Sequence, residues 1–215
     1  MPSQEPLSQP GLIETLLWVP GEGYFLLDEH LARLGHSAGI LGHRHEATRI
    51  AAALDRVAGA TERLRVRLVL HHDGEVEVTA QPLPVLAAGT VWRTAIADTR
   101  LDSGDPLLAH KTTRRAFYDE ERMRLASSCK ADEAIFFNER GEICEGGITT
   151  IFVSRGTRLL TPPLSRGLLP GVLRQHLIAR GEATEGDIGL EDLANGFLLG
   201  NSVRGLIPAR LVEPA

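Results

Sequence analysis

Two side chains of this sequence, Lys111 and Glu145, could act together in amine chemistry. Of the 23 lysine and arginine residues, only Lys111 and Lys130 are lysines, so a chain that almost always uses arginine keeps a lysine here. Lysine can lose its proton and form an imine, which arginine cannot do. By residue type alone, each would be a solvated surface charge. A nucleophilic amine with a distant acid is nevertheless typical of an enzyme that uses a Schiff-base cofactor.

Glu145 has a more specific interpretation. The ring of pyridoxal phosphate (PLP) acts as an electron sink only while its pyridine nitrogen stays protonated, and a nearby carboxylate favours that state. Gly146 and Gly147 follow directly and would let the backbone pass close to such a ring. The alternative is an ordinary strand-end carboxylate.

A cofactor phosphate would need donors. Leu168–Arg174 predicts a loop that enters a helix, and the amides of Val172 and Leu173 would point outward from its positive N-terminal end. An ordinary helix start beginning near a proline is the alternative. The small polar loop Gly200–Ser202, with Asn201 at its centre, is a second candidate. Arg33 could add formal charge, although alone it resembles any helix-surface arginine.

The hydrophobic pattern predicts a mixed α/β fold in two parts. Residues 1–86 are expected to form a small N-terminal α/β domain and residues 87–215 a larger C-terminal α/β domain, with the linker between 83 and 90. Strands are expected at 11–19, 24–27, 63–70, 76–80, 91–96, 134–137, 142–153, 159–160, 197–199 and 205–209. Helices are expected at 28–41, 45–57, 111–127, 170–179 and 190–194.

Composition excludes several classes of protein. The net charge is −5 and the basic residues form no long block, which argues against a nucleic-acid partner. Cys129 and Cys144 show no metal or disulfide spacing, and no histidine group has a third ligand, so no metal is expected. The leader Met1–Pro10 is polar and not a signal peptide, and no apolar run could span a membrane. A reducing cytoplasm fits these observations.

The sequence resembles the class IV (fold type IV) PLP enzymes, which include branched-chain aminotransferase, D-amino-acid aminotransferase and 4-amino-4-deoxychorismate lyase. The resemblance runs from about Gly11 to Val212. The segments that carry it, in this order, are 12–16 (LIETL), 27–34 (LDEHLARL), 110–115 (HKTTRR), 138–146 (NERGEICEG), 160–164 (LTPPL) and 167–174 (GLLPGVLR). The forms KTTRRAFYD and LGNSVRGLIPA are most similar to the aminodeoxychorismate lyase domain.

The resemblance implies a role for each candidate residue. Lys111 matches the lysine that binds PLP covalently, and Glu145 matches the acid that faces the pyridine nitrogen. The predicted phosphate contacts are the side chain of Arg33, the backbone of Val172 and Leu173, and the loop residues Asn201 and Ser202. Arg67 and Arg115 are hypotheses for the substrate carboxylates.

The resemblance also implies a function. The first hypothesis is a PLP-dependent lyase of the folate pathway that converts 4-amino-4-deoxychorismate to 4-aminobenzoate and pyruvate. It would work as a cytoplasmic homodimer with the cofactor between the two domains, of which the larger, residues 87–215, is the cofactor-binding domain. The alternatives are an amino-acid transaminase of the branched-chain or D-amino-acid type and a catalytically silent homologue.

Three departures from the family pattern bear on this choice. Thr150 stands five positions after the acid, where the family often has asparagine. Ala116 stands five positions after the lysine, where branched-chain transaminases have tyrosine, which argues against that branch. The usual N-terminal Gly-Asp-Gly segment is replaced by the proline-rich leader.

Overall fold

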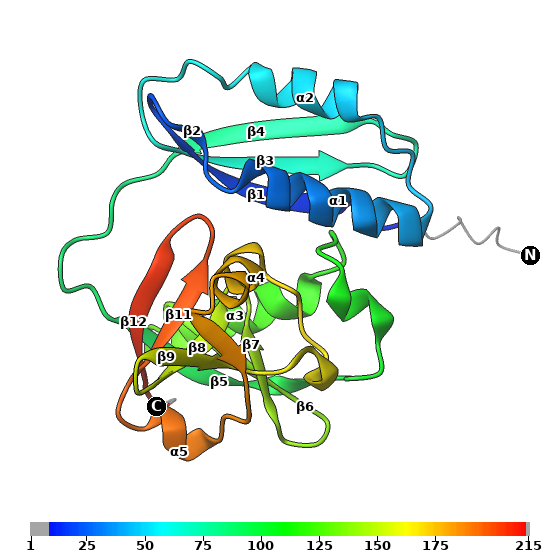
Figure 1. The fold of residues 1–215 in the computed structure, drawn as a ribbon. Coiled ribbons are helices and arrows are strands. Elements are labelled where there is room, and N and C mark those ends of the chain that lie inside the picture. The colour runs from blue at the N-terminus through cyan, green and yellow to red at the C-terminus, as the bar shows by residue number, and fades with distance from the viewer. Residues whose placement is uncertain (1–8, 214–215) are drawn as a thin grey trace, which may run out of the picture. The chain divides into compact units, whose positions relative to one another are not determined.

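The computed structural model describes residues 9–213, so most of the leader Met1–Pro10 lies outside the described residues. The chain divides into two units, which Figure 1 shows as a ribbon. Unit 1 comprises the chain up to Pro82 together with Lys111–Arg114, and unit 2 comprises Leu83–His110 and the chain from Arg115 onward. Lys111 therefore belongs to unit 1, although the chain before it and the chain from Arg115 onward belong to unit 2.

Unit 1 is an antiparallel sheet with two helices packed against it. The strand order is β2-β1-β3-β4. Helix α1 packs against β1, and helix α2 packs against β4. The elements are β1 (Leu12–Val19), β2 (Gly23–Tyr24), α1 (Leu27–Leu41), α2 (Ala47–Asp55), β3 (Leu64–Leu70) and β4 (Val76–Pro82).

The two faces of the unit 1 sheet differ because side chains alternate along each strand. In β1, Leu12 and Leu16 belong to the core that α1 and α2 cover, so Glu14 points to the same side. In β3, Val66 and Leu68 point into that core, and Arg67 between them therefore points to the opposite face. The predicted alternation of residues 63–70 is confirmed.

Unit 2 contains an eight-stranded mixed sheet in the order β10-β9-β8-β11-β12-β5-β6-β7. Strand β7 forms one edge of this order, yet only three residues of chain separate it from β8. The sheet must therefore curl. Its strands are β5 (Trp92–Leu101), β6 (Glu133–Asn138), β7 (Ile143–Gly146), β8 (Thr150–Arg155), β9 (Arg158–Thr161), β10 (Ala183–Glu185), β11 (Phe197–Asn201) and β12 (Gly205–Leu211).

The helices of unit 2 cover this sheet. Helix α3 (Ala116–Cys129) packs against β5 and β6, and α4 (Val172–Ala179) packs against β10 and β11. Short helical turns lie at η1 (Pro106–Ala109), η2 (Leu164–Arg166) and α5 (Leu190–Leu193). Strands β6 and β7 are buried on both faces, which fits their nearly continuous apolar sequences. No helix within residues 9–213 has the length and apolar character that a membrane span requires.

The predicted helix at 111–127 begins five residues later than the sequence suggests. Helix α3 starts at Ala116, and Lys111–Thr113 is extended instead. The Ile13 amide donates to the Lys111 carbonyl at 2.7 Å, and the Thr113 amide donates to the Gly11 carbonyl at 2.8 Å. These bonds to β1 stabilise an extended backbone, and the β-branched Thr112 and Thr113 favour it as well.

Candidate active site

Lys111 lies on an added edge of the unit 1 sheet. Leu12 and Thr112 form an antiparallel bridge, so Lys111 is opposite Ile13. The Gly11 amide also donates to the Thr113 hydroxyl at 3.0 Å. The lysine is half-buried. Backbone hydrogen bonds on both sides of Thr112 connect this segment to Ile13 of β1 and to Gly11 directly before β1. Such an attachment holds the start of a flexible side chain in one place.

The same register places Arg67 and Lys111 on one face of this sheet. Arg67 is opposite Thr15 in the β1–β3 ladder, and Ile13 and Thr15 share a face because they are two residues apart. Lys111, opposite Ile13, points to that face as well. The two predicted residues therefore occupy the sheet face away from α1 and α2. The prediction that Arg67 binds a substrate carboxylate is not tested by this placement.

Arg33 is bound by Glu14, which points to the face of the unit 1 sheet that α1 and α2 cover. Its Nε donates to Oε1 at 2.9 Å and its Nη2 to Oε2 at 2.7 Å, a bidentate pair. His30 Nδ1 lies 2.6 Å from the same Oε2. Burial by itself raises the pKa of Glu14, but Arg33 and His30 more than offset it and bring the pKa down to about 2. Glu14 is therefore an anion at neutral pH, and it orients Arg33.

Glu145 is buried on β7, where both of its oxygens accept hydrogen bonds. The Tyr118 hydroxyl donates to Oε1 at 2.5 Å, and the Leu169 amide donates to Oε2 at 3.1 Å. Burial raises the pKa of Tyr118 strongly, and the charge of Glu145 and their hydrogen bond raise it further. Tyr118 is therefore a protonated donor at neutral pH. The sequence indicated Glu145 but not Tyr118, which lies seven residues after Lys111.

The turn after Glu145 is built around a second buried acid, Glu133. Its carboxylate accepts from Arg122 Nε at 2.8 Å and from the Ile148 amide and Thr149 hydroxyl at 3.0 Å each. A side chain at Gly146 would collide with the Thr149 hydroxyl, so the turn needs glycine there. Burial raises the pKa of Glu133 despite these donors. Glu133 was not among the predicted residues, although a charge at the start of a buried strand was a signal for it.

Arg115 is bound to its own neighbourhood. Its guanidinium forms a salt bridge with Asp119 one helical turn later, Nη2 to Oδ1 at 3.0 Å, and also donates to the Gly147 carbonyl at 3.0 Å. The side chain is largely buried. These contacts tie the start of α3 to the turn after Glu145, and they give Arg115 a positioning role in this structure. The prediction that it binds a substrate carboxylate is not tested here.

The two predicted phosphate-binding segments of unit 2 lie next to Thr150. Thr150 is opposite Gly200 in the β8–β11 ladder. A Cβ atom at Gly171, directly before α4, would lie 2.8 Å from the Thr150 hydroxyl oxygen. The N-terminal turn of α4, with Val172 and Leu173, and the end of β11 therefore flank the same threonine.

The loop of Asn201 and Ser202 is closed by the asparagine side chain. Asn201 Oδ1 accepts from the amides of Val203 at 3.0 Å and Arg204 at 2.8 Å, while its Nδ2 donates to the Ile148 carbonyl at 3.2 Å. Ser202 is buried. The loop is thus tied to the turn that follows Glu145, so the candidates of unit 2 converge on residues 145–150.

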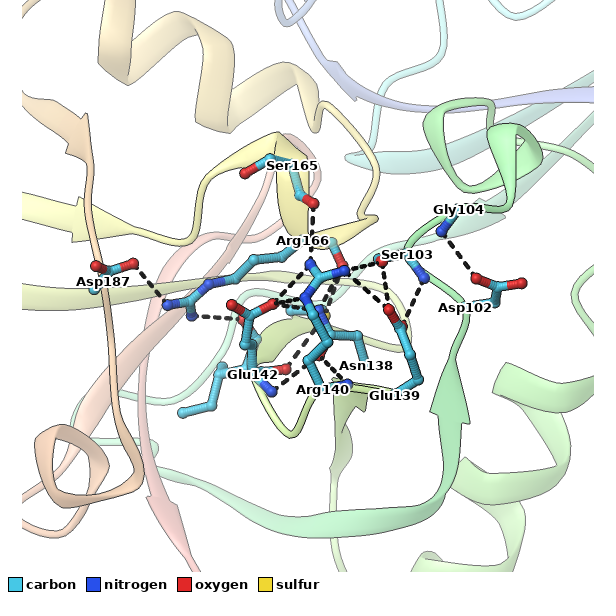
Figure 2. Close-up of polar contacts among 12 residues, drawn as sticks. Asp102, Ser103, Gly104, Asn138, Glu139, Arg140, Glu142, Ser165, Arg166 and Asp187 are labelled. Atoms are coloured by element: carbon cyan, nitrogen blue, oxygen red, sulfur yellow. Dashed lines mark hydrogen bonds and ion pairs between the residues drawn. The ribbon is translucent and has the colours of Figure 1, made fainter.

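A polar network supports the hairpin that carries Glu145. Figure 2 shows Arg140 pointing at Glu139 and Glu142, with Ser103 beside it. The buried Arg166 donates to the carbonyls of Ile143 at 3.0 Å and Ile188 at 3.2 Å.

The same network joins the hairpin to η2. Asn138 Nδ2 donates to the Arg166 carbonyl at 3.1 Å, and the Cys144 thiol donates to that carbonyl at 3.3 Å. Burial raises the pKa of Cys144 to about 12, so this thiol stays protonated. The hairpin is therefore joined to the loop whose Leu169 amide reaches Glu145.

Comparisons with known proteins agree on a family. The model of the family described as "Amino-transferase class IV" matches residues 11–212. A Schizosaccharomyces pombe protein named "Putative aminodeoxychorismate lyase" is 33% identical over 215 residues, covering 96% of this chain and 91% of that protein. An aminodeoxychorismate lyase of Saccharomyces cerevisiae is 28% identical over 187 residues, covering 66% of this chain and 50% of that protein.

Solved structures share the fold. A crystal structure from Mesorhizobium loti, described as a "Putative amino-acid aminotransferase", is 46% identical with a TM-score of 0.90, and the match covers 95% of this chain and 100% of that chain. A branched-chain aminotransferase of Thermoproteus uzoniensis is 25% identical with a TM-score of 0.77, covering 94% of this chain and 78% of that chain. The predicted fold type IV architecture is confirmed. The chain belongs to the class IV aminotransferase family.

Proposed function

We propose that this protein is a PLP-dependent lyase that converts 4-amino-4-deoxychorismate to 4-aminobenzoate and pyruvate. The observation that carries the proposal is the 33% identity over nearly all of both chains with a relative named as an aminodeoxychorismate lyase, in a chain that retains Lys111 and Glu145. The sequence KTTRRAFYD and the absence of tyrosine at position 116 favour the same conclusion.

The chemistry of the residues fits PLP. A pyridine ring needs an acid that stays ionised, and Glu145 is a buried carboxylate with a hydroxyl and an amide donating to it. A phosphate needs donors, and the start of α4 offers outward-pointing amides beside the hydroxyl of Thr150. Arg33 carries a charge that Glu14 orients. Lys111 supplies the amine.

The residues divide the proposed reaction among them. PLP, when bound, withdraws electrons from the carbon that bears the substrate amine. The Lys111 amine takes the proton from that carbon and later returns one to the leaving enolpyruvyl group, which departs as pyruvate. Glu145 would accept the hydrogen bond of the ring nitrogen and favour its protonated state. Arg67 and Arg115 are the proposed partners of the substrate carboxylates. Formation of the aromatic product drives the step.

The second candidate is an amino-acid transaminase on the same scaffold. The observation that favours it is the 46% identity with the Mesorhizobium loti protein, whose description names an amino-acid aminotransferase. The two activities need the same lysine and acid, so these residues do not distinguish them. The third candidate is a silent homologue, which the retained Lys111 and Glu145 argue against.

A product assay separates the three candidates. Purified protein reconstituted with PLP is expected to release equal amounts of 4-aminobenzoate and pyruvate from 4-amino-4-deoxychorismate without an added keto acid. Strict dependence on a keto-acid acceptor would favour the transaminase. A protein that takes up no PLP would exclude both enzymes and leave the silent homologue.

The two lysines, Lys111 and Lys130, allow a matched test of where PLP is attached. Borohydride reduction of the PLP-loaded protein is expected to fix the label on Lys111, with loss of the visible band. The variant Lys111→Arg should take up no reducible label and lose activity by more than a thousandfold, as expected when a nucleophile is removed. Lys130→Arg is the control, because Lys130 is exposed at the end of α3. Light scattering of the same preparations tests the proposed homodimer.

A further inference from the structure

The hydroxyl of Tyr118 is aimed at Glu145 by an aromatic cluster. The ring of Tyr118 lies 4.1 Å from that of Phe117 and 4.8 Å from that of Phe136, measured between centroids, and the contact with Phe136 is edge-to-face. Phe136 is completely buried on β6, next to β7. Packing of this kind restricts the ring to one position, so its hydroxyl remains directed at the carboxylate.

Two donors to Glu145 come from separate elements of unit 2. Tyr118 on α3 holds Oε1, and the Leu169 amide in the loop before α4 holds Oε2. Both donors are neutral. A bond from a hydroxyl to a carboxylate is short and strong, and it stabilises the ionised form without adding a positive charge beside it. Glu14, by contrast, is held by the guanidinium of Arg33.

A neutral donor set has a consequence for a pyridinium ring. An arginine at the Oε1 position would compete electrostatically with a protonated ring nitrogen for the carboxylate. A hydroxyl donor brings no positive charge of its own, so it stabilises the carboxylate without competing for a cationic partner. The hydroxyl also prevents rotation of the carboxylate, because it fixes one oxygen while Leu169 fixes the other.

We propose that Tyr118 is a positioning residue that keeps Glu145 ionised and directed at the ring nitrogen of the cofactor. The proposal rests on the proposed function in one respect only, namely that the protein binds PLP. It gives a residue on α3 a part in setting the protonation state of the ring.

The variant Tyr118→Phe removes the hydroxyl and keeps the ring in its aromatic cluster. We expect the dissociation constant for PLP to rise roughly tenfold, the effect of losing one hydrogen bond to a charged group. With PLP labelled with ¹⁵N in the ring, the ring nitrogen resonance should move toward the value of the unprotonated pyridine. Borohydride should still fix the label on Lys111. An unchanged ¹⁵N shift in a folded, loaded variant would overturn the proposal.

Tyr24→Phe is the matched control. Tyr118 and Tyr24 are the two tyrosines of the chain, and Tyr24 donates to the Leu54 carbonyl at 2.9 Å within unit 1. Losing that hydroxyl removes a hydrogen bond without touching Glu145. It should leave the ¹⁵N signal and the PLP affinity unchanged. A shift of the ring signal in both variants would mean that the effect is general destabilisation, which would also contradict the proposal.

An experiment on the apoprotein separates failure of this proposal from failure of the proposed function. The ¹³Cζ resonance of Tyr118 at neutral pH, assigned by its loss in Tyr118→Phe, reports the hydrogen bond of its hydroxyl. The variant Glu145→Gln should move this resonance, because the negative acceptor is gone. Arg115, with its guanidinium carbon 5.8 Å from the ring, and the neutral Cys144 thiol are the other ionisable groups around it.

The outcomes are distinct. An unchanged Tyr118 resonance in Glu145→Gln would show that the two side chains are not coupled and would overturn the proposal, whether or not PLP binds. A shifted resonance in a protein that takes up no PLP would leave the contact intact but refute the proposed function and, with it, the role of Tyr118 toward the ring. If Tyr118→Phe does not fold, the comparison of wild type with Glu145→Gln still decides the coupling.

Discussion

Glu14 in unit 1 and Glu133 in unit 2 are buried to nearly the same degree, with exposed fractions of 2% and 1%, yet their pKa values move in opposite directions. Burial taken alone would raise the pKa of both carboxyls. In Glu14 the bidentate Arg33 and the adjacent His30 outweigh burial and lower the pKa to about 2. In Glu133 the contacts from Arg122, two backbone amides and a hydroxyl leave the pKa raised.

The geometry and exposure of the cation account for the difference. Arg33 donates to both oxygens of Glu14, and its side chain is only 11% exposed, so water screens the pair weakly. Arg122 contacts Glu133 through Nε, and its side chain is 30% exposed. Each glutamate supports a different part of the site. Glu14 orients a predicted phosphate arginine, whereas Glu133 shapes the turn after Glu145.

The largest expected effect is that of Glu14→Gln. A pKa lowered from 4.5 to about 2 corresponds to about 3 kcal/mol of stability at neutral pH. Because the folded pKa lies below the unfolded one, this contribution is present above pH 4.5 and is lost as the pH falls toward 2. The stability gap between wild type and Glu14→Gln should therefore shrink across that window in urea unfolding.

Glu62→Gln, at an exposed glutamate of the same unit, is the control and should change stability by less than about 0.5 kcal/mol. A gap for Glu14→Gln that stays constant from pH 7 to pH 2 would show that Arg33 and His30 do not hold the carboxylate as an anion. The contrast between Glu14 and Glu133 would then no longer hold.

Glu133→Gln should have a smaller effect and the opposite pH trend. The folded pKa of Glu133 lies above the unfolded one, so its contribution is full below the unfolded pKa and falls as the pH rises. The gap between wild type and Glu133→Gln should therefore be widest in acid and narrow toward neutral pH, where we expect about 1 kcal/mol. Urea unfolding at a series of pH values measures it, and a gap that widens with pH would contradict the assignment.

The sequence indicated the candidate residues Lys111 and Glu145 but not the side chains that position them. Lys111 stood out as one of only two lysines among 23 lysine and arginine residues, and Glu145 because two glycines follow it. Glu14, by contrast, is a charged residue within an otherwise largely apolar strand. Its role depends on Arg33, 19 positions away on a helix, and no local pattern encodes that contact.

The contacts of Tyr118 and the backbone at Lys111 escaped prediction for the same reason. Tyr118 and Glu145 are 27 positions apart, and their hydrogen bond depends on how α3 packs on β6. The extended backbone at Lys111 results from pairing with Ile13, a tertiary interaction that overrides the helical spacing of the following residues. Periodicity predicted β3 and α4 correctly because those patterns are local.

The smallest expected effect, that of Thr149→Val, tests whether Glu133 acts through neutral donors. The Thr149 hydroxyl donates to Glu133 Oε2 at 3.0 Å, and valine has nearly the same shape without the donor. The loss should destabilise the protein by about 1 kcal/mol, and it should raise the pKa of Glu133 further, since one of the groups that favour the anion is gone. Urea unfolding of Thr149→Val beside Thr79→Val, at an exposed position on β4, isolates the buried hydrogen bond. If the two variants lose the same stability, the hydroxyl does not support Glu133, and the turn after Glu145 is held by Arg122 and the backbone amides alone. Glu133 would then resemble Glu14, with a cation as its main partner, and the two units would hold their site residues by the same means.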